Sequence, residues 1–299
     1  PYFLSYFLQT LYGLADLFII GQFDGVDSIT AVSIGSQIMH MITVMIVGLS
    51  MGATVCIAQA VGAKDKEKLR YCIGNTVTVF FIVSLILTGL LLFFTDFIVG
   101  VVKTPTEAVA GTKEYLIICF IGIPLITAYN IVSSILRGMG DSKSPMYFIA
   151  IACVANIILD YVFIGYFKLG AVGAALGTTL SQGISVICAL TYINRNNSSD
   201  SFSFAYLKLK GNIAKRLLRI GIPICVQDGF IQVAFMVITV IANMRGLTDA
   251  AAVGIVEKLI SFIFLVPSSM LSTVSAMGAQ NIGAGKIDRA KQTLRYAIY

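Results

Sequence analysis

The chain is built from long, uninterrupted apolar segments separated by short polar loops. Eight such segments can be read, and they span 2–22, 29–60, 71–95, 115–136, 146–167, 171–193, 220–244 and 250–278. A helix needs about 20 apolar residues to cross the roughly 30 Å hydrocarbon layer of a bilayer. Successive segments of this length predict an all-α, polytopic integral membrane protein. The second segment is too long for a straight crossing, so we expect its helix to continue past the bilayer.

Both ends of the sequence fall within apolar sequence. The sequence begins at Pro1 inside the first apolar segment, and a ninth apolar segment begins at Tyr296 and is cut off at Tyr299. No signal peptide is recognisable at the start. We therefore expect a chain truncated at both ends.

The placement of the basic residues carries more information than the net charge of +6. Most of the 21 Lys and Arg residues lie in the loops that follow segments two, four, six and eight. Basic loops of helical membrane proteins face the cytoplasm. The pattern predicts a multi-pass protein of the cell membrane whose basic loops are cytoplasmic and whose first helix runs outward. Alternation with apolar segments argues against a nucleic-acid-binding surface.

These alternating loops hold Lys64, Lys66, Lys68, Arg70, Arg137, Lys143, Arg195, Lys208, Lys210, Lys215, Arg216, Arg219, Lys286, Arg289, Lys291 and Arg295. The opposite loops hold only Lys103, Lys113, Lys168 and Arg245. The six cysteines are scattered singly, with no CxxC pair. Redox and metal sites need clustered thiolates, so the cysteines are interpreted as small packing residues and no cofactor is expected.

One polar segment divides the chain. Residues 194–219 are rich in Ser, Asn and basic residues and are predicted to be a cytoplasmic linker. Residues 1–193 would then form an amino-terminal lobe with helices one to six. Residues 220–299 would begin a carboxy-terminal lobe with helices seven and eight and the start of helix nine.

The second group of segments repeats the first. Residues 16–70 align with 237–291 at a constant shift of 221, pairing Gly62 with Gly283 without a gap. Because both copies cross the membrane in the same direction, the repeat is parallel. Parallel repeats pack as two lobes around an axis along the membrane normal, with a cavity between them, and this is a transporter architecture.

Ionisable groups within apolar segments are functional candidates, since burying them in hydrocarbon is costly. They are Asp16, His40, Asp160, Asp228, Glu257 and Lys258. Asp16 and Asp160 fall at one depth, about 10 Å below the outer boundary, when 1.5 Å of rise is counted per residue. Asn156 lies one turn deeper than Asp160 on the same helix face, and Thr178 reaches this level on the next helix.

Two carboxylates, a carboxamide and a hydroxyl at one depth form a set of hard oxygen ligands. Such a set suits a small cation such as Na⁺, and two carboxylates at low dielectric would alternatively retain a proton. A purely structural alternative is that each Asp hydrogen-bonds its neighbours for helix packing. Asp228 is either a second protonation or substrate-cation site or a polar residue lining the cavity. His40 is either a hydrogen-bonded interior residue or a proton relay, and Glu257 and Lys258 have no assigned role.

Several motifs, in the correct order, resemble the multidrug and toxic compound extrusion (MATE) family. They are LYGLADLFIIGQFDG at 11–25, LRGMGDSKSP at 136–145, NIILDYVFI at 156–164, GAVGAALGTTLS at 170–181, and the paired loops AQAVGAK and AQNIGAGKIDRA. The resemblance spans the chain and about two thirds of a twelve-helix member. It implies a monomeric, two-lobed 6+6 helix transporter rather than an enzyme. Such a protein exports cationic amphipathic drugs or toxins across the lipid bilayer by Na⁺- or H⁺-coupled antiport.

The resemblance also implies roles for single residues. Asp16 matches the first-helix carboxylate of the family, and Asn156, Asp160 and Thr178 match the polar cluster of its prokaryotic DinF-like branch. Pro1 falls where that branch has a proline at which helix one bends.

Gln9, Tyr12 and Asn130 match positions that line the amino-terminal cavity of the family, and Asp228 is a further candidate cavity residue. The NorM-like branch carries a Glu on helix seven. Here the segment reads GIPICVQDGFIQV, with Asp228 about one turn early. This departure favours the DinF-like branch.

Other functions remain open. A flippase for lipid-linked oligosaccharide or polysaccharide precursors has a related architecture, but it would need basic residues in its cavity to bind pyrophosphate. A membrane-embedded enzyme is disfavoured because the sequence has no HExxH and only one His. The repeat disfavours a receptor or channel.

Overall fold

The computed structural model describes residues 1–195, 207, 209–245 and 247–299, and between 243 and 258 several residues by backbone alone. Every regular element in these ranges is helical. In chain order they are α1 (Tyr2–Phe23), α2 (Val26–Gly62), α3 (Lys66–Phe93), α4 (Thr95–Val101), η1 (Thr106–Ala108), α5 (Val109–Ile121), α6 (Ile123–Met139), α7 (Lys143–Asp160), η2 (Tyr161–Tyr166), α8 (Gly170–Arg195), α9 (Gly211–Arg245), α10 (Leu247–Gly283) and α11 (Ile287–Ile298).

Seven of these helices are long and apolar enough to cross a bilayer, and the bent pair of α5 and α6 brings the number to eight. The pair corresponds to the fourth predicted segment and bends by 46° at its break. Pro124 lies in the first turn of α6, where a residue without an N–H is tolerated. The expectation of an overlong second helix is confirmed, since α2 has 37 residues and is therefore about 55 Å long.

Two helices begin earlier than hydropathy predicted. α9 starts at Gly211, within the predicted linker, and α11 starts at Ile287 rather than near Tyr296. Lys, Arg, Leu and Ala favour helix, so these basic stretches extend the helices, whereas hydropathy detects only their apolar part. Most of the remaining linker, 196–206 and 208, lies outside the described residues.

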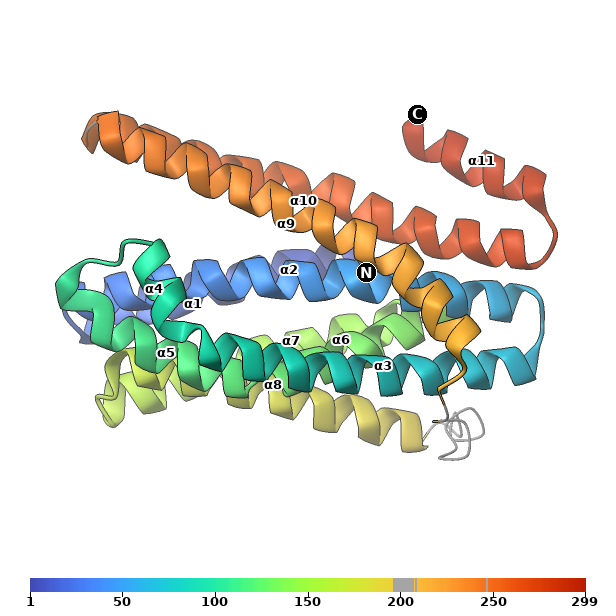
Figure 1. Cartoon of the computed structure of the whole chain (residues 1–299), viewed down its shortest axis with the longest axis horizontal. Coiled ribbons are helices and arrows are strands. Elements are labelled where there is room, and N and C mark those ends of the chain that lie inside the picture. Colours follow the sequence, from blue (N-terminus) through green and yellow to red (C-terminus); the bar gives the residue numbers. More distant parts are fainter. Residues whose placement is uncertain (196–206, 208, 246) are drawn as a thin grey trace.

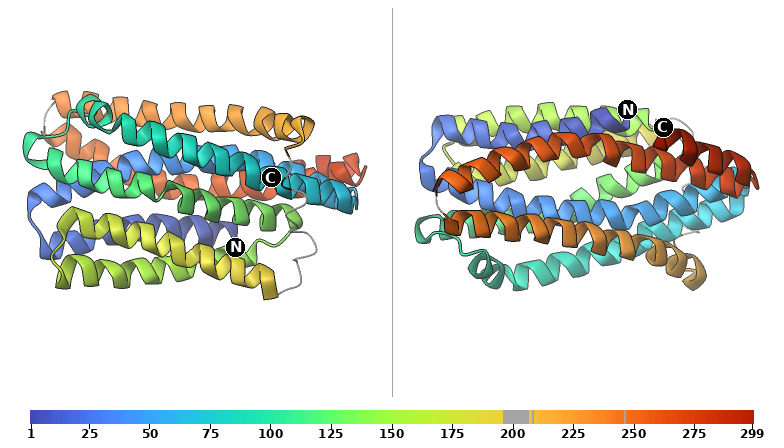
Figure 2. Two further views of the ribbon diagram at one scale, coloured as in Figure 1. Left: turned by 60° about the horizontal axis from the view of Figure 1, so that its bottom comes forward. Right: turned by 90° about the horizontal axis from the view of Figure 1, so that it is seen from above.

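The helices form one elongated bundle in which α2 is the central element (Figure 1). It packs against α5 and α6 on one side and against α9 and α10 on the other. Seen from above, α10 runs beside α1, which in turn packs on α7 (Figure 2). The loops after α2, α6 and α10 and the carboxyl end of α8 lie at one end of the bundle, which we call the basic end (Figure 1).

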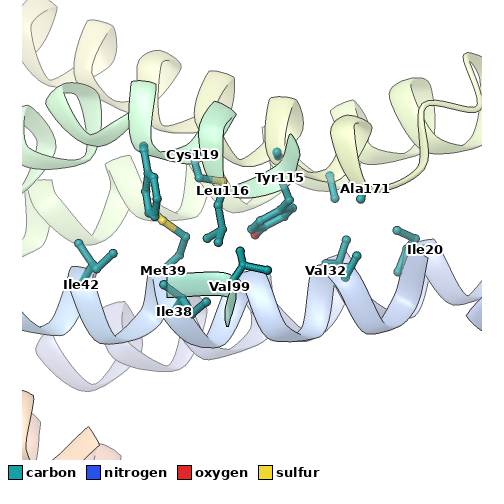
Figure 3. Close-up of a cluster of buried hydrophobic side chains, with 14 of the residues drawn as sticks. Ile20, Val32, Ile38, Met39, Ile42, Val99, Tyr115, Leu116, Cys119 and Ala171 are labelled. Carbon is teal, nitrogen blue, oxygen red and sulfur yellow. The ribbon is translucent and has the colours of Figure 1, made fainter. Parts of the chain in front are cut away.

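The largest apolar cluster joins α2 to α5 and α8, away from the basic end (Figure 3). Tyr115 and Leu116 of α5 face Val32 and Ile38 of α2 in this cluster. The Tyr115 ring lies directly on Gly35, where an added Cβ would overlap the ring. On the outside of the bundle, many large apolar side chains are exposed, as expected of a surface that contacts lipid.

The predicted repeat is visible in the helix boundaries. α10 has the bounds of α2 shifted by 221 residues at both ends, and α11 begins 221 residues after α3. The turns agree as well, because Lys64 and Gly285 both have left-handed backbones, with φ of 54° and 71°. In each turn this residue donates its N–H to the carbonyl three residues earlier, at 3.0 Å.

Near the basic end, α2 meets α9 and α10 through glycines. Gly52 lies against the Leu217 carbonyl and Gly221 against the Leu49 carbonyl, so neither position has room for a side chain. Gly62 and Gly283 make the corresponding contacts between α2 and α10. These helices therefore approach backbone to backbone, which only glycine permits.

Candidate functional site

Asp16, Asn156, Asp160 and Thr178, which the sequence placed at one depth, lie together between α1, α7 and α8, and we call them the polar cluster. The Thr178 hydroxyl donates a hydrogen bond to Oδ2 of Asp16 at 3.2 Å. The exposed fractions are 3% for Asp16, 0% for Asn156 and Asp160, and 6% for Thr178. The cluster is therefore closed to solvent in this conformation.

Helix packing explains how these side chains meet. α7 packs against both α1 and α8, and Asn156 and Asp160 lie one turn apart on one face of α7. Asp160 is the last residue of α7 and is followed at once by the π-helical turn Tyr161–Tyr166. Such turns occur frequently at functional sites because they re-aim neighbouring side chains.

Gly177 of α8 provides the space that the Asp160 carboxylate occupies. A Cβ at this position would overlap Oδ1 of Asp160 and lie 3.6 Å from Nδ2 of Asn156. Gly177 lies within the motif at 170–181, but the sequence analysis gave it no role of its own. Its role depends on a helix–helix contact that no sequence pattern reveals.

The two carboxylates face each other, and Asn156 and Thr178 lie within interaction range of Asp16. Oδ1 of Asp16, both carboxylate oxygens of Asp160 and both side-chain polar atoms of Asn156 are nevertheless buried without a hydrogen-bond partner of good geometry. Unsatisfied buried polar atoms are rare in native proteins. Five of them meet here, so hydrogen bonds of good geometry leave most polar atoms of this cluster unpaired.

The charges of the polar cluster are not balanced by basic side chains. In the part of the chain that the structure describes, no Lys or Arg side chain acts electrostatically on Asp16 or Asp160. Two adjacent carboxylates without a counter-charge are costly at low dielectric. A bound proton or a monovalent hard cation would remove this cost, and the carboxylate, carboxamide and hydroxyl oxygens are suitable ligands for such a cation.

A polyvalent metal centre is a poorer match. Among the described residues, no group of three or more His, Cys, Asp or Glu side chains is arranged to hold a metal ion. The donor set of the cluster, two carboxylates with neutral oxygens, is more suitable for a single positive charge.

Tyr12 and Gln182 extend the cluster toward the basic end. Tyr12 lies one turn from Asp16 on α1, and its hydroxyl is within reach of Thr178 and Gln182. Gln182 is 8% exposed, and its Oε1 is buried without a partner. The sequence analysis missed Gln182, although its position one turn after Thr178 was a usable signal.

The other predicted cavity residues lie elsewhere. Gln9 is half-buried on α1, and Asn130 is buried on α6, where its Nδ2 donates to the Ile126 carbonyl at 2.8 Å. Asp228 of α9 is half-buried against α2, with Oδ2 beside Gly48. α9 has no packing contact with α1, α7 or α8 in the described ranges, so Asp228 is separate from the polar cluster.

Pro1 lies at the N-cap position of α1, and its carbonyl accepts hydrogen bonds from the Ser5 N–H and hydroxyl, at 2.9 and 3.0 Å. A bend at Pro1 stays a prediction. His40 is exposed on α2, and both alternatives for its role stay predictions. The side chains of Glu257 and Lys258 lie outside the described residues.

Comparison with known proteins gives a consistent result. The family model MatE matches residues 1–162 and 223–299. The probable multidrug resistance protein YoeA of Bacillus subtilis is 30% identical over 306 residues, which cover 100% of this chain and 66% of YoeA. The probable multidrug resistance protein YpnP of the same organism is 31% identical over 289 residues, covering 97% of this chain and 64% of YpnP.

The fold agrees with solved structures as well. A crystal structure of MATE in the bent conformation superimposes with a TM-score of 0.89 at 24% identity, covering 100% of this chain and 67% of that one. The chain spans slightly less than two thirds of the length of YoeA and YpnP.

Proposed function

This chain belongs to the MatE family, and from that membership and the polar cluster we propose that it is the greater part of a cation-coupled multidrug efflux antiporter. Its relatives are described as probable multidrug resistance proteins. The proposed substrates are cationic amphipathic compounds, and the proposed coupling ion is Na⁺ or H⁺. We place the protein in the cell membrane as a monomer, with the basic end in the cytoplasm.

The observation that carries the proposal is the set of unpaired buried oxygens on Asp16, Asn156 and Asp160. A cation held between them would satisfy these oxygens and neutralise the two carboxylates together. Asp16 and Asp160 would supply the charge, while Asn156 and Thr178 would supply neutral oxygens. The departure from the NorM-like pattern near Asp228 supports assignment to the DinF-like branch.

Antiport requires that cation and drug favour different states of the protein, because a ligand shifts an equilibrium only through differential affinity. α1 is suited to link these states, since it carries Asp16 and also touches α10. The Tyr6 hydroxyl lies 2.9 Å from the Ser272 hydroxyl, and the Phe7 and Phe262 rings are 6.5 Å apart. Neutralisation of Asp16, with a bend at Pro1, would thus move a helix that contacts both sides of the proposed cavity.

The proposed substrate cavity is lined by Gln9, Tyr12 and Asn130, and Asp228 of α9 is a further candidate residue for it. Because the polar cluster is closed to solvent here, cation entry requires a rearrangement of the helices around it. This requirement agrees with alternating access, in which each site opens to one side at a time.

The test is dye transport in vesicles that contain the intact protein, with a Na⁺ gradient and a proton gradient imposed separately. At least one gradient should drive efflux of a fluorescent cationic dye, and Asp16→Asn and Asp160→Asn should abolish it. Asp96→Asn, which removes the exposed carboxylate that pairs with Lys113, is the control and should transport normally. Full gradient-driven efflux in both cluster variants would refute the assignment.

A further inference from the structure

A pocket at the basic end lies apart from the polar cluster and from the proposed substrate cavity. It has a volume of about 150 Å³ and is lined by Cys56, Lys68, Cys72, Asn212, Ile213 and Arg216. We propose that this basic pocket binds a phosphate group, either the headgroup phosphate of an anionic lipid or free inorganic phosphate.

Three helices form the pocket. Cys56 lies near the end of α2, Lys68 in the first turn of α3, and Arg216 in the second turn of α9. Lys68 and Arg216 are far apart in sequence and lie on opposite sides of the predicted linker. A ligand that contacts both would therefore bridge the two groups of helices that the linker connects.

The pocket has an excess of positive charge. Lys68 and Arg216 are both close enough to Cys56 and Cys72 to act on them electrostatically. In the described part of the chain, neither cation forms an ion pair with a carboxylate. Arg216 donates one hydrogen bond, from Nη2 to Oε1 of Gln59 at 2.5 Å. A guanidinium has five N–H donors, so Arg216 retains donors for an anion.

The nearby carboxylates of Asp65 and Glu67 do not line this pocket. Asp65 accepts the Lys68 N–H at 2.9 Å and so caps the start of α3. Asp65 and Glu67 line an adjacent, more open cavity, which also contains Lys210 and shares Lys68 and Ile213 with the basic pocket. Lys210 is placed over the Tyr71 ring, with Nζ 3.1 Å from its centroid. The basic pocket is therefore lined by cations and neutral side chains alone.

The start of α9 adds to this potential. Asn212 and Ile213 belong to the first turn of a 35-residue helix, and both line the pocket. The Ile213 N–H is bonded to the Lys210 carbonyl at 2.9 Å, so the contribution of this helix start is the partial positive charge of its dipole, which favours anions. The start of α9, the Arg216 guanidinium and the Lys68 ammonium therefore all border the same pocket.

Size and chemistry select a phosphate group. At about 30 Å³ per water molecule, the pocket holds roughly five waters, which is room for one phosphate and its remaining hydration. Arg binds phosphate oxygens through its planar fork, and Lys adds a point charge. The apolar walls from Cys56, Cys72 and Ile213, and the position at the end of membrane-spanning helices, suit a lipid headgroup.

A bound phosphate would favour the arrangement seen here. Next to the pocket, Gly52 packs on Leu217 and Gly221 on Leu49, so α2 and α9 are in backbone contact. An anion held by Lys68 and Arg216 is bound only while α3 and α9 stay close. It would therefore stabilise the state in which the basic end is closed.

The test is direct binding to the intact protein in nanodiscs, with affinity as the readout. One arm titrates fluorescent phosphatidylglycerol into phosphatidylcholine nanodiscs, and the other titrates inorganic phosphate and follows thermal unfolding. The variant Lys68→Gln/Arg216→Gln should weaken binding about tenfold or more, since charge-assisted hydrogen bonds are lost. The matched control is Lys66→Gln/Arg219→Gln, which removes one exposed cation from each of the same two helices, and it should bind within about twofold of the wild type.

Saturable binding in either arm that only the pocket variant loses supports the site, and the arm that responds identifies the source of the phosphate. Equal losses in both variants would show a diffuse basic surface and overturn the proposal, as would no saturable binding in either arm. If the double variant does not fold, Lys68→Gln alone keeps the bond from Arg216 to Gln59 and should still weaken binding. Because no transport is measured, the result is independent of the proposed antiport.

Discussion

Gly62 and Gly283 pack reciprocally where α2 and α10 cross, each lying against the main-chain carbonyl three residues before the other. Gly62 meets the carbonyl of Gln280, and Gly283 meets the carbonyl of Gln59. The two glycines are also equivalent in the repeat, being 221 residues apart, so the contact is locally symmetric. It closes the basic end with two backbones and no intervening side chain. Any state that opens this end must break it.

Replacing Gly62 with Ala should loosen this closure. The new Cβ would overlap the Gln280 carbonyl, and overpacking of this kind costs about 1–3 kcal/mol. We expect a lower thermal unfolding midpoint and greater reactivity of Cys56 and Cys72 toward thiol reagents applied from the basic end, since both are 3% exposed.

The matched control for Gly62→Ala is Gly278→Ala. Gly278 lies on α10 five residues before Gly283, and a Cβ there meets no atom within 4 Å. Because Ala is a better helix former than Gly by about 1 kcal/mol, this control should not lower the midpoint. A Gly62→Ala protein as stable and as unreactive as the control would contradict the contact.

Replacing Asp160 with Asn should separate function from stability. The substitution keeps the shape of the side chain and removes one of two adjacent buried carboxyl groups. The thermal unfolding midpoint should stay equal or rise, because sites that hold unfavourable charges for function are often stabilised when those charges are removed. In the same preparation, gradient-driven dye efflux should be lost. A large fall in the midpoint would indicate that Asp160 acts mainly in packing.

Asp141 should contribute a pH-dependent part of the stability. Its Oδ1 accepts the N–H groups of Lys143 and Ser144 at 3.0 Å, and its Oδ2 accepts the hydroxyls of Ser144 at 2.5 Å and Tyr192 at 3.2 Å. Partial burial alone would raise the pKa of Asp141, but these hydrogen bonds outweigh it and lower the pKa. The loop between α6 and α7 is thus fixed by an ionised carboxylate.

The direction of the pH dependence of stability follows from the lowered pKa of Asp141. The contribution is complete above the unfolded value, about 3.9, and is lost as the pH falls through the lower folded value. Asp141→Asn should therefore reduce the free energy of unfolding by about 1 kcal/mol at pH 7, and the difference from the wild type should shrink below about pH 4. Unfolding midpoints measured from pH 3 to pH 7 test this, with the exposed Asp288→Asn as control. A difference that grows toward low pH would contradict the assignment.

The pairing of Asp16 with Asp160 could be predicted because helix rise is constant. Both depths were obtained by counting residues from the ends of two apolar segments. The two side chains predicted at the same depth lie together in the structure. The repeat was equally accessible, since the same helix boundaries recur at a shift of 221. These inferences use distances along a helix, which sequence specifies.

Contacts between helices that are far apart in sequence could not be predicted by counting along one helix. That Gly177 makes room for Asp160, and that Gly62 meets Gln280, depends on which faces of two helices meet. Lys68 and Arg216 were read as members of two separate basic loops, and only the packing of α3 against α9 brings them to one pocket. The early start of α9 at Gly211 was missed because hydropathy does not detect helical turns made of polar and basic residues.

Gly177 offers the most specific test of the polar cluster, because it changes the cluster without changing any of its ligands. In Gly177→Ala the new Cβ would displace Oδ1 of Asp160, and misplacing a ligand typically costs 10- to 100-fold in ion affinity. We expect the Na⁺ or H⁺ concentration needed for half-maximal efflux to rise by about tenfold or more, with normal expression. Gly183→Ala on the same helix, where a Cβ meets Leu125 Cδ1 at an ordinary 3.6 Å, should leave it unchanged. Identical cation dependence in the two variants would mean that the Asp160 carboxylate does not hold the coupling ion.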